Sequence, residues 1–357
     1  IRISMLKTNK VFIDTQTYVK AGLHFEGVAF KAFHELCAKG DLVLITTTVV
    51  EREVKGKIEE SIKDALQAIN TVQRKARLLN SIDNGPLHGF FQQFNEHEIH
   101  EAAQKVFDDF LKGCHAKLAT IEVIDLNEVL DKYFGKEPPF GQNKKKSEFP
   151  DAINLAAVER FVNDEDVYII SEDSDLKNYC DGKNNLHQID SLDKFLGEYN
   201  THTNELSNKL MQFIESKRED IRADVIAQLN DADGYNVSTW EDAELDSFEV
   251  VNIDDFEPSI IKIDNNYCLA TFSVSVDFEV TVSGPDFNNG YWDSEDKVMI
   301  PMETTTRTEV QEISFDIEIE VMYEIEDGEL TDIAFDVNID KLSRGIEFSI
   351  EENNFEY

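Results

Sequence analysis

Four aspartates stand where an apolar stretch ends or a helix begins, and they are well placed to do chemistry. Asp14 follows the apolar run "VFI", Asp173 and Asp175 come shortly after "VYII", and Asp151 opens the helical pattern "DAINLAAVERFV". Crowded carboxylates repel each other unless a cation lies among them, and Mg²⁺ and Mn²⁺ prefer such oxygen ligands. We therefore expect a divalent metal site if the fold brings these side chains together.

The stretches around these acids alternate between strand and helix patterns. Short apolar runs predict buried strands, and apolar residues at helical spacing predict the helices between them. In chain order the sequence predicts a strand at 10–14, a helix within 18–37, a strand at 41–45, a helix at 151–162, a strand at 167–171 and a helix at 191–199. This order is typical of an α/β fold, in which the carboxyl ends of parallel strands meet at one edge of the sheet.

The middle of this region is predicted to be helical and then looped. A charged helical pattern covers about 49–79, and a second helix fits about 96–111. The segment "KEPPFGQNKKKSEFP", 136–150, contains three prolines and a lysine run, which predicts a loop. Its lysines, Lys144, Lys145 and Lys146, precede Asp151 closely.

The last third of the chain changes class. Residues 203–230 fit one long amphipathic helix. From about 245 onward, apolar and polar residues alternate with a period of two, as in antiparallel strands with one solvated face. The Asp-Gly pair in "EDGE" predicts a hairpin turn. Because the polar positions are mostly Asp and Glu, we predict a small acidic antiparallel sheet or sandwich packed on one side.

The charge of the chain is strongly negative and unevenly distributed. The formal net charge is -38, which usually argues against nucleic acid as a partner because phosphates are repelled. Residues 231–357 contain 34 acidic and 5 basic residues, whereas residues 1–230 contain 38 acidic and 29 basic residues. The first part of the chain is nearly balanced, so it remains compatible with binding nucleic acid.

The cysteines and the apolar stretches point to a cytoplasmic protein. Cys37, Cys114, Cys180 and Cys268 lie far apart without a CxxC pair, which indicates reduced thiols and neither a zinc knuckle nor a disulfide framework. No stretch approaches the roughly 18 to 20 apolar residues that span a bilayer, and no secretory signal pattern is present. We predict no membrane association.

The aspartates and their neighbours resemble the motifs of the PIN-domain nucleases. These motifs are an apolar strand ending in Asp and a hydroxyl residue ("IDTQ"), a mid-chain Glu on the second helix, an Asp opening a later helix ("FPDAI") and a strand that runs into a hydroxyl-x-Asp-x-Asp turn ("SEDSDL"). The closing "IDSLDKFL" is similar to the last strand-to-helix passage of that family. The resemblance covers about 10–200, apart from 60–135, and does not extend to the acidic strands.

This resemblance implies a PIN-like three-layer α/β fold around a central, mostly parallel sheet. It implies a PIN-like nuclease domain at 5–200 with a helical insertion at about 60–135. For the rest of the chain, the residue patterns predict a helical linker at 201–244 and an acidic antiparallel β domain at 245–357.

The resemblance also implies which residues act. Asp14, Asp151 and Asp173 would bind Mg²⁺ or Mn²⁺, Asp175 would be an additional ligand, and the mid-chain Glu would complete the catalytic set. Glu51 and Glu53 lie about 200° apart around a helix, so both cannot face one site. We favour Glu53, because it precedes an apolar residue as the Glu of the family often does. Nucleic acid would contact Thr15, Ser171 and Lys144, Lys145 and Lys146.

Simpler interpretations exist for each motif. Asp14 and Asp151 are good helix N-caps, and Asp173 with Asp175 fits an ordinary turn. The lysine run is more often a solvated loop than a phosphate site. "HEIHE" at 97–101 has a spacing that can bind a metal, but no third ligand is evident, so an exposed helix face is favoured.

The function implied by the resemblance is metal-dependent hydrolysis of phosphodiesters, in RNA first and DNA second. The acidic β domain would then regulate the nuclease, bind a protein partner or mediate self-association, which suits a toxin-like or defence effector. The main alternative is a catalytically silent PIN-like protein that binds nucleic acid or acts as a scaffold. A phosphatase with Asp14 as nucleophile ranks lower, because Gln16 stands where such enzymes place a second Asp.

Overall fold

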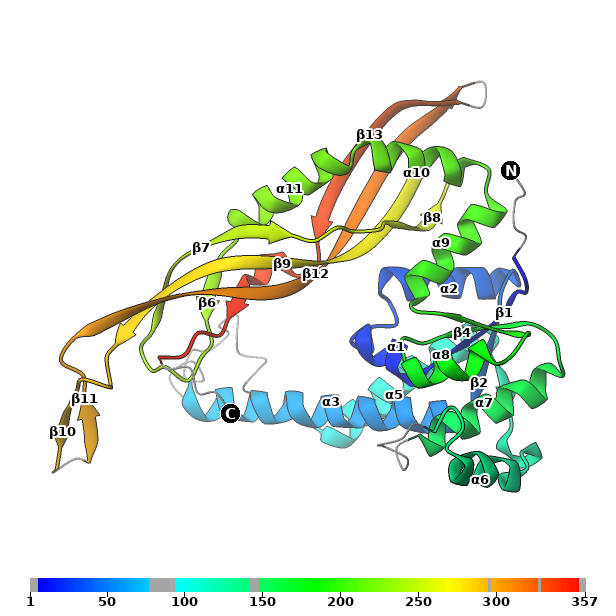
Figure 1. Cartoon of the computed structure of the whole chain (residues 1–357), viewed down its shortest axis with the longest axis horizontal. Coiled ribbons are helices and arrows are strands. Elements are labelled where there is room, and N and C mark those ends of the chain that lie inside the picture. The colour runs from blue at the N-terminus through cyan, green and yellow to red at the C-terminus, as the bar shows by residue number, and fades with distance from the viewer. Residues whose placement is uncertain are drawn as a thin grey trace. The chain divides into compact units, whose positions relative to one another are not determined.

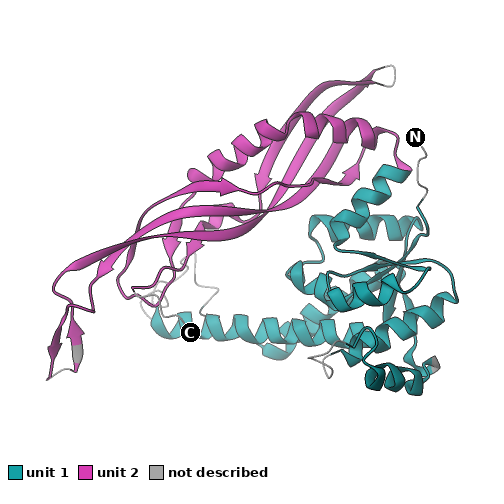
Figure 2. Ribbon diagram, viewed as in Figure 1, with its two compact units in different colours: residues 1–202 teal, residues 203–357 magenta. Residues whose placement is uncertain are grey.

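The chain folds into two compact units, residues 1–202 and 203–357 (Figure 2). The computed structural model describes residues 6–76, 91, 94–140, 148–294, 297–326 and 329–352. The first unit carries the aspartates with candidate chemistry, and the second carries the acidic strands.

A five-stranded parallel sheet forms the centre of the first unit. Its strands are β1 (Lys10–Ile13), β2 (Val43–Thr47), β3 (Lys117–Ala119), β4 (Val167–Ile170) and β5 (Leu186–Ile189). They lie in the order β3-β2-β1-β4-β5, and every neighbouring pair is parallel. The strands β1 and β4 are almost wholly apolar because helices cover the sheet. The predicted α/β class with a parallel sheet is confirmed.

Helices surround this sheet, with α2 and α9 on one side and α3 and α7 on the other (Figure 1). The helices of the unit are α1 (Thr15–Lys20), α2 (Val28–Lys39), α3 (Thr48–Lys75), α5 (Glu96–Gly113), α6 (Leu126–Gly135), α7 (Phe149–Val162), α8 (Ser174–Asp181) and α9 (Leu192–Thr203), with a short 3₁₀ helix at Ile121–Val123. Side-chain caps explain several of the helix starts. Thr47 caps α3, Asn95 caps α5 and Asp125 caps α6 by accepting hydrogen bonds from first-turn amides.

The stretch 60–135 is not a wholly helical insertion. It includes β3, which pairs with β2 and forms one edge of the central sheet. The strand has three residues, two of them exposed, so the alternation that marks a strand is too short to be recognised in the sequence.

An aromatic cluster fixes α5 against the start of the chain. Tyr18 stacks on Phe30, and Phe107 of α5 meets the Tyr18 ring edge-on with 5.7 Å between centroids. Phe110 contacts the same rings. The C-terminal end of α5, which leads into β3, therefore has a fixed place beside the sheet.

The second unit is built on a long antiparallel sheet. Its strands β7 (Glu244–Ile253), β9 (Tyr267–Pro285), β12 (Thr304–Glu326) and β13 (Glu329–Ile339) lie in the order β13-β12-β9-β7, and β8 (Ser259–Ile263) also pairs with β9. Short pairs are formed by β6 (Gly234–Asn236) with β14 (Ile346–Phe348), and by β10 (Tyr291–Asp293) with β11 (Val298–Ile300). A 3₁₀ helix covers Leu342–Arg344. The predicted antiparallel β region is confirmed.

Residues 203–230 form two helices, where the periodicity predicted one. Helix α10 (Leu206–Ser216) and helix α11 (Arg218–Asn230) meet at Lys217, whose backbone leaves the helical range. Leu210, Ile214, Val225 and Leu229 are buried in the same core as the inner residues of β9 and β12. Both helices therefore contribute to the core of the second unit.

Two of the sequence features lie outside the described residues. These are the lysines Lys144, Lys145 and Lys146 and the Asp-Gly pair at 327–328. The strands on either side of that pair are antiparallel neighbours, with Glu326 opposite Glu329. Among the described helices, none is both long enough and apolar enough to cross a membrane.

Candidate active site

Asp14 lies at the carboxyl end of β1, in the middle of the sheet. Its backbone N–H donates to the carbonyl of Ile170 on β4, and its side chain accepts a 2.8 Å hydrogen bond from the backbone N–H of Thr15. Asp14 thus caps α1, as the simpler interpretation expected. The residue is only 4% exposed, so capping has been combined with burial of a carboxylate.

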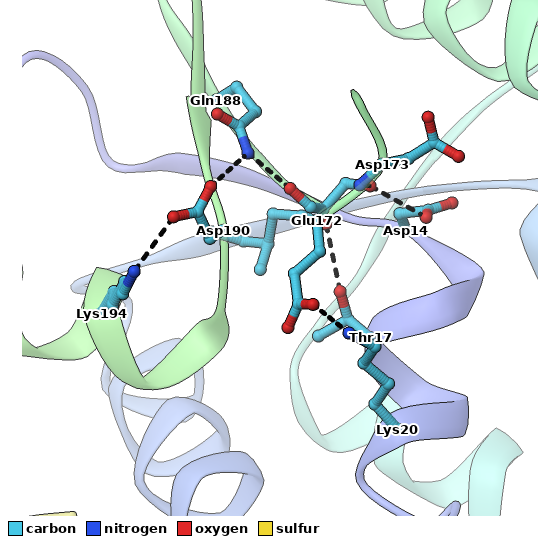
Figure 3. Close-up of polar contacts among 10 residues, drawn as sticks. Asp14, Thr17, Lys20, Glu172, Asp173, Gln188, Asp190 and Lys194 are labelled. Atoms are coloured by element: carbon cyan, nitrogen blue, oxygen red, sulfur yellow. Dashed lines mark hydrogen bonds and ion pairs between the residues drawn. The ribbon is translucent and has the colours of Figure 1, made fainter. Parts of the chain in front are cut away.

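Ser171 connects Asp14 to Asp173. Its Oγ donates to Asp14 Oδ2 at 3.1 Å and accepts from the backbone N–H of Asp173, also at 3.1 Å. Asp173 in turn caps α8 and accepts from the backbone N–H of Asp175 at 2.6 Å. Figure 3 shows how this places Asp14 and Asp173 together at the ends of neighbouring strands.

Glu53 reaches the same place from α3. The Thr15 hydroxyl donates to Glu53 Oε2 at 2.7 Å, which ties the first turn of α1 to the second turn of α3. Val50, Val54 and Ile58 form the buried stripe of α3 and so fix its rotation about its axis. Glu51 faces elsewhere, because its charge interacts with Lys55 and Asp108.

Asp151 completes the group from the first turn of α7. It is not the N-cap, which is Glu148; Pro150 precedes it within the turn. Burial first, and then the charges of Asp14, Glu53, Asp173 and Glu148, together raise the pKa of Asp151 to about 8. Because these charges act on Asp151, the residues that carry them lie near it. The structure therefore brings together four of the predicted residues: Asp14, Glu53, Asp151 and Asp173.

The electrostatics of Asp14 have the same cause. The pKa of Asp14 is raised to about 6, chiefly by burial and in small part by the charge of Glu53, against the opposing effect of the hydrogen bonds from Ser171 and Thr15. Asp175 lies near the margin of the group. Its pKa is also raised, by burial and by the charge of Asp173.

The donor set is that of a hard divalent cation, since it consists of carboxylate oxygens. The raised pKa values of Asp14 and Asp151 mark a concentration of negative charge that a bound cation would relieve. As the side chains stand, however, the described residues contain no group of three His, Cys, Asp or Glu side chains close enough together to hold a metal ion. The donor atoms thus suit Mg²⁺ or Mn²⁺, and the residues lie near one another. To bind a metal ion, their oxygens must move closer together.

Two polar residues near the four acids, Glu148 and Asn154, were not predicted from the sequence. Glu148 is buried and contributes to the negative charge felt by Asp151. Asn154, one turn after Asp151, is 1% exposed; its Oδ1 accepts from the Thr47 hydroxyl, while its Nδ2 has no partner among the described residues. The three-residue spacing from Asp151 places Asn154 on the same helix face, which was the available signal for it.

Contacts around the rim hold the turn after β4. Glu172 points away from Asp14 and forms an ion pair with Lys20 of α1 (Figure 3). On the other side, the Gln188 amide donates to the carbonyl of Ser171 and to Asp190, which pairs with Lys194 at 3.0 Å. Ser171 is thus fixed through its hydroxyl, its carbonyl and its backbone N–H, which donates to the carbonyl of Ile189 at 3.0 Å.

The family comparison agrees with this geometry. Residues 11–176 match the family model of the PIN domain. Searches of curated proteins and of solved structures gave no significant match to the chain. The matched residues run from β1 to the start of α8 and include the four neighbouring acids, Asp14, Glu53, Asp151 and Asp173. The second unit lies outside the match.

Proposed function

We propose that the PIN domain within residues 11–176 is a metal-dependent endoribonuclease. One observation carries this proposal: Asp14, Glu53, Asp151 and Asp173 come from four separate segments and lie near one another at the carboxyl edge of a parallel sheet. Such a concentration of carboxylates, one buried and three half-buried, opposes folding and is a common mark of a functional site. PIN domains are in general metal-dependent nucleases, which makes RNA the expected substrate class and DNA the second.

The residues of the group have distinct roles in this proposal. Asp14, Asp151 and Asp173 would hold one or two Mg²⁺ or Mn²⁺ ions, with Asp175 as an additional ligand. When bound, such an ion lowers the pKa of a water molecule and stabilises the charge of the reacting phosphate. Ser171 orients Asp14 and the start of α8 through its two hydrogen bonds, and Thr15 orients Glu53. Lys144, Lys145 and Lys146 would contact the substrate backbone.

The acidic unit is proposed to regulate this activity. An acidic surface repels nucleic acid and attracts basic proteins, so it suits shielding of the nuclease or docking of a basic partner, or self-association through uncharged parts of the sheet. Regulated cutting of this kind is compatible with a toxin-like or defence role in the cytoplasm.

A cleavage assay tests the proposal directly. Labelled single-stranded and folded RNA and DNA are incubated with the full-length protein in Mn²⁺, Mg²⁺ or EDTA, beside Asp14→Asn and Asp173→Asn. We expect metal-dependent cutting by the wild type, abolished by EDTA and by either substitution. Equal cutting by the wild type and both variants would exclude a nuclease at these residues.

The alternative is a catalytically silent PIN domain that binds nucleic acid or acts as a scaffold. It is favoured by the absence of a closely converged metal-binding group among the described residues. Nucleic-acid binding with the same affinity in Mn²⁺ and in EDTA, without any cutting, would select this alternative.

A further inference from the structure

A hollow of about 410 Å³ lies beside the edge strand β3 of the first unit. Its walls come from the end of β2, the first turn of α3 and the connection between α5 and β3. The polar and charged residues that line it are Thr46, Glu51, Lys112, His115 and Lys117. None of them is one of the four acids of the candidate active site.

Thr46, which lines this hollow, carries a buried hydroxyl without a hydrogen-bond partner in the described part of the chain. The residue is 2% exposed. A buried hydroxyl without a partner is destabilising, typically by about 1–3 kcal/mol. Its neighbour Thr47, which faces the other way, has satisfied its hydroxyl with Val50 and Asn154. A ligand oxygen in the hollow would supply the partner that Thr46 lacks.

Three basic side chains surround the same hollow. Lys112 lies in the last turn of α5, and His115 and Lys117 follow the end of that helix. Lys112 also complements the negative end of the α5 dipole, but His115 and Lys117 lie beyond the helix. In a chain with a net charge of -38, this grouping favours an anionic ligand.

One acid lines the hollow, and a second acid lies near the first. Glu51 is the one carboxylate among the lining residues given above. Next to it, Asp108 is paired with Lys55 at 2.7 Å. The negative charge of Glu51 should weaken the binding of an anion. Its removal in Glu51→Gln should therefore strengthen that binding.

We propose that this hollow binds a phosphate group through Thr46, Lys112, His115 and Lys117. The phosphate belongs either to a nucleic-acid strand that continues from the candidate active site or to a free nucleotide. Ile45 of β2 pairs with Phe12 of β1 on one side and with Lys117 on the other, so Lys117 lies two strand spacings, roughly 10 Å, across the sheet from β1. Assignment to a strand rests on the proposed nuclease function, whereas the phosphate site itself does not.

Calorimetric titration of the full-length protein in EDTA tests the site without any cleavage. The ligands are inorganic phosphate, a nucleoside 5′-monophosphate and a six-nucleotide RNA. We expect Lys112→Ala and Lys117→Ala each to weaken phosphate binding about tenfold, as loss of a charge-assisted hydrogen bond does. Thr46→Val should weaken it severalfold, and Glu51→Gln should strengthen it.

Lys39→Ala is the matched control. Lys39 is an exposed lysine in the last turn of α2, as Lys112 is in the last turn of α5, and it lies outside the hollow. It should leave the affinity unchanged. Thermal unfolding of Thr46→Val should show no loss of stability, because the variant removes a hydroxyl that had no partner.

The ligand series separates the two sources of phosphate. RNA that binds more tightly than the monophosphate, with Lys117→Ala raising KM and leaving kcat unchanged, assigns the hollow to the nucleic-acid strand. A monophosphate that binds as tightly as RNA assigns it to a free nucleotide. Unchanged phosphate affinity in Lys112→Ala, Lys117→Ala and Thr46→Val, or an equal loss in Lys39→Ala, would overturn the site. A wild type that cuts nothing but keeps the expected binding pattern refutes the nuclease and retains the site.

Discussion

The two units use the same side chains, Asp and Glu, in opposite ways. In the first unit Asp14 and Asp151 are withdrawn from water, and burial raises the pKa of both. In the second unit many acids line the solvated face of the sheet, where Asp277 stands opposite Glu312, and Glu279 stands opposite Glu249. Like charges on neighbouring strands repel each other weakly in water, whereas like charges repel strongly in a buried site.

Sheet architecture explains the difference. Parallel strands deliver their carboxyl ends to one edge, so single acids from distant segments converge there. Antiparallel strands with period-2 alternation spread their acids evenly over one face, beside water and small polar partners such as Ser273, which donates to Asp316 at 2.6 Å. A few acids in the first arrangement can form a reactive site, while many acids in the second form a charged surface.

The sharpest test of this contrast removes one carboxylate from each unit. Asp14→Asn should reduce cleavage on the order of 10³-fold, the loss typical when a group that stabilises transition-state charge is removed. Asp277→Asn, on the solvated face, should leave cleavage within about twofold of the wild type, since surface substitutions of this kind perturb little. Initial rates under excess enzyme measure both effects.

The Asp14→Asn protein should remain folded. The amide oxygen still accepts the hydrogen bond from the backbone N–H of Thr15, and the new amide NH₂ donates to the Ser171 hydroxyl, which accepts as well as donates. Circular dichroism and thermal unfolding check this. A correctly folded variant with full activity would mean that the two populations of acids do not differ in function.

The next largest effect is expected at the two glutamates of α3. Glu53→Gln should lower kcat roughly 10–100-fold, by analogy with the loss of a group that supports a metal site. Glu51→Gln should leave kcat unchanged, because Glu51 lies among Lys55 and Asp108 and not among the aspartates. A greater loss of kcat in Glu51→Gln than in Glu53→Gln would mean that Glu51, and not Glu53, faces the aspartates.

The stability of the metal-free protein should depend on pH through the buried aspartates. Their pKa values, about 6 for Asp14 and about 8 for Asp151, exceed the ordinary 3.8, so the folded state binds these protons more tightly than the unfolded chain. Their stabilising contribution is therefore complete below about pH 4 and is lost as the pH rises through 6 and then 8. Urea unfolding in EDTA between pH 5.5 and 8.5 measures it.

Asp151→Asn is the control for this pH dependence. It removes the group with the higher pKa, so the free energy of unfolding should fall less between pH 5.5 and 8.5 than in the wild type. Mn²⁺ at pH 8 should raise the thermal midpoint of the wild type and have a smaller effect on this variant. A pH dependence equal in both proteins would assign it to other groups.

The smallest effect is expected on the solvated face of the second unit. The triple substitution Asp277→Asn, Glu279→Gln, Glu312→Gln should change the free energy of unfolding by no more than about 0.5 kcal/mol per site. If this face shields the nuclease, the same protein should cut nonspecific RNA a few times faster at low salt, and the gain should vanish at high salt. Rates that are unchanged at every salt concentration favour partner docking over shielding.

Much of the fold was predictable because it rests on local patterns. The apolar runs of β1 and β4 and the alternation in β9 and β12 each indicate a strand. The strand β3 and the break at Lys217 were missed, since a three-residue strand and a one-residue interruption leave almost no periodic signal. Both depend on packing against elements that are distant in the sequence.

The candidate active site also has a part that the sequence predicted and a part that only the structure shows. The sequence by itself determined that acids follow the ends of apolar strands, and it placed Asp14, Asp151 and Asp173 in recognisable motifs. Only the tertiary structure decided that Glu53 joins them, that Ser171 links two of them, and that Thr46 lines a separate, basic hollow. The physical reason is that helix rotation, strand order and burial arise from contacts between remote segments, and a local pattern does not encode them.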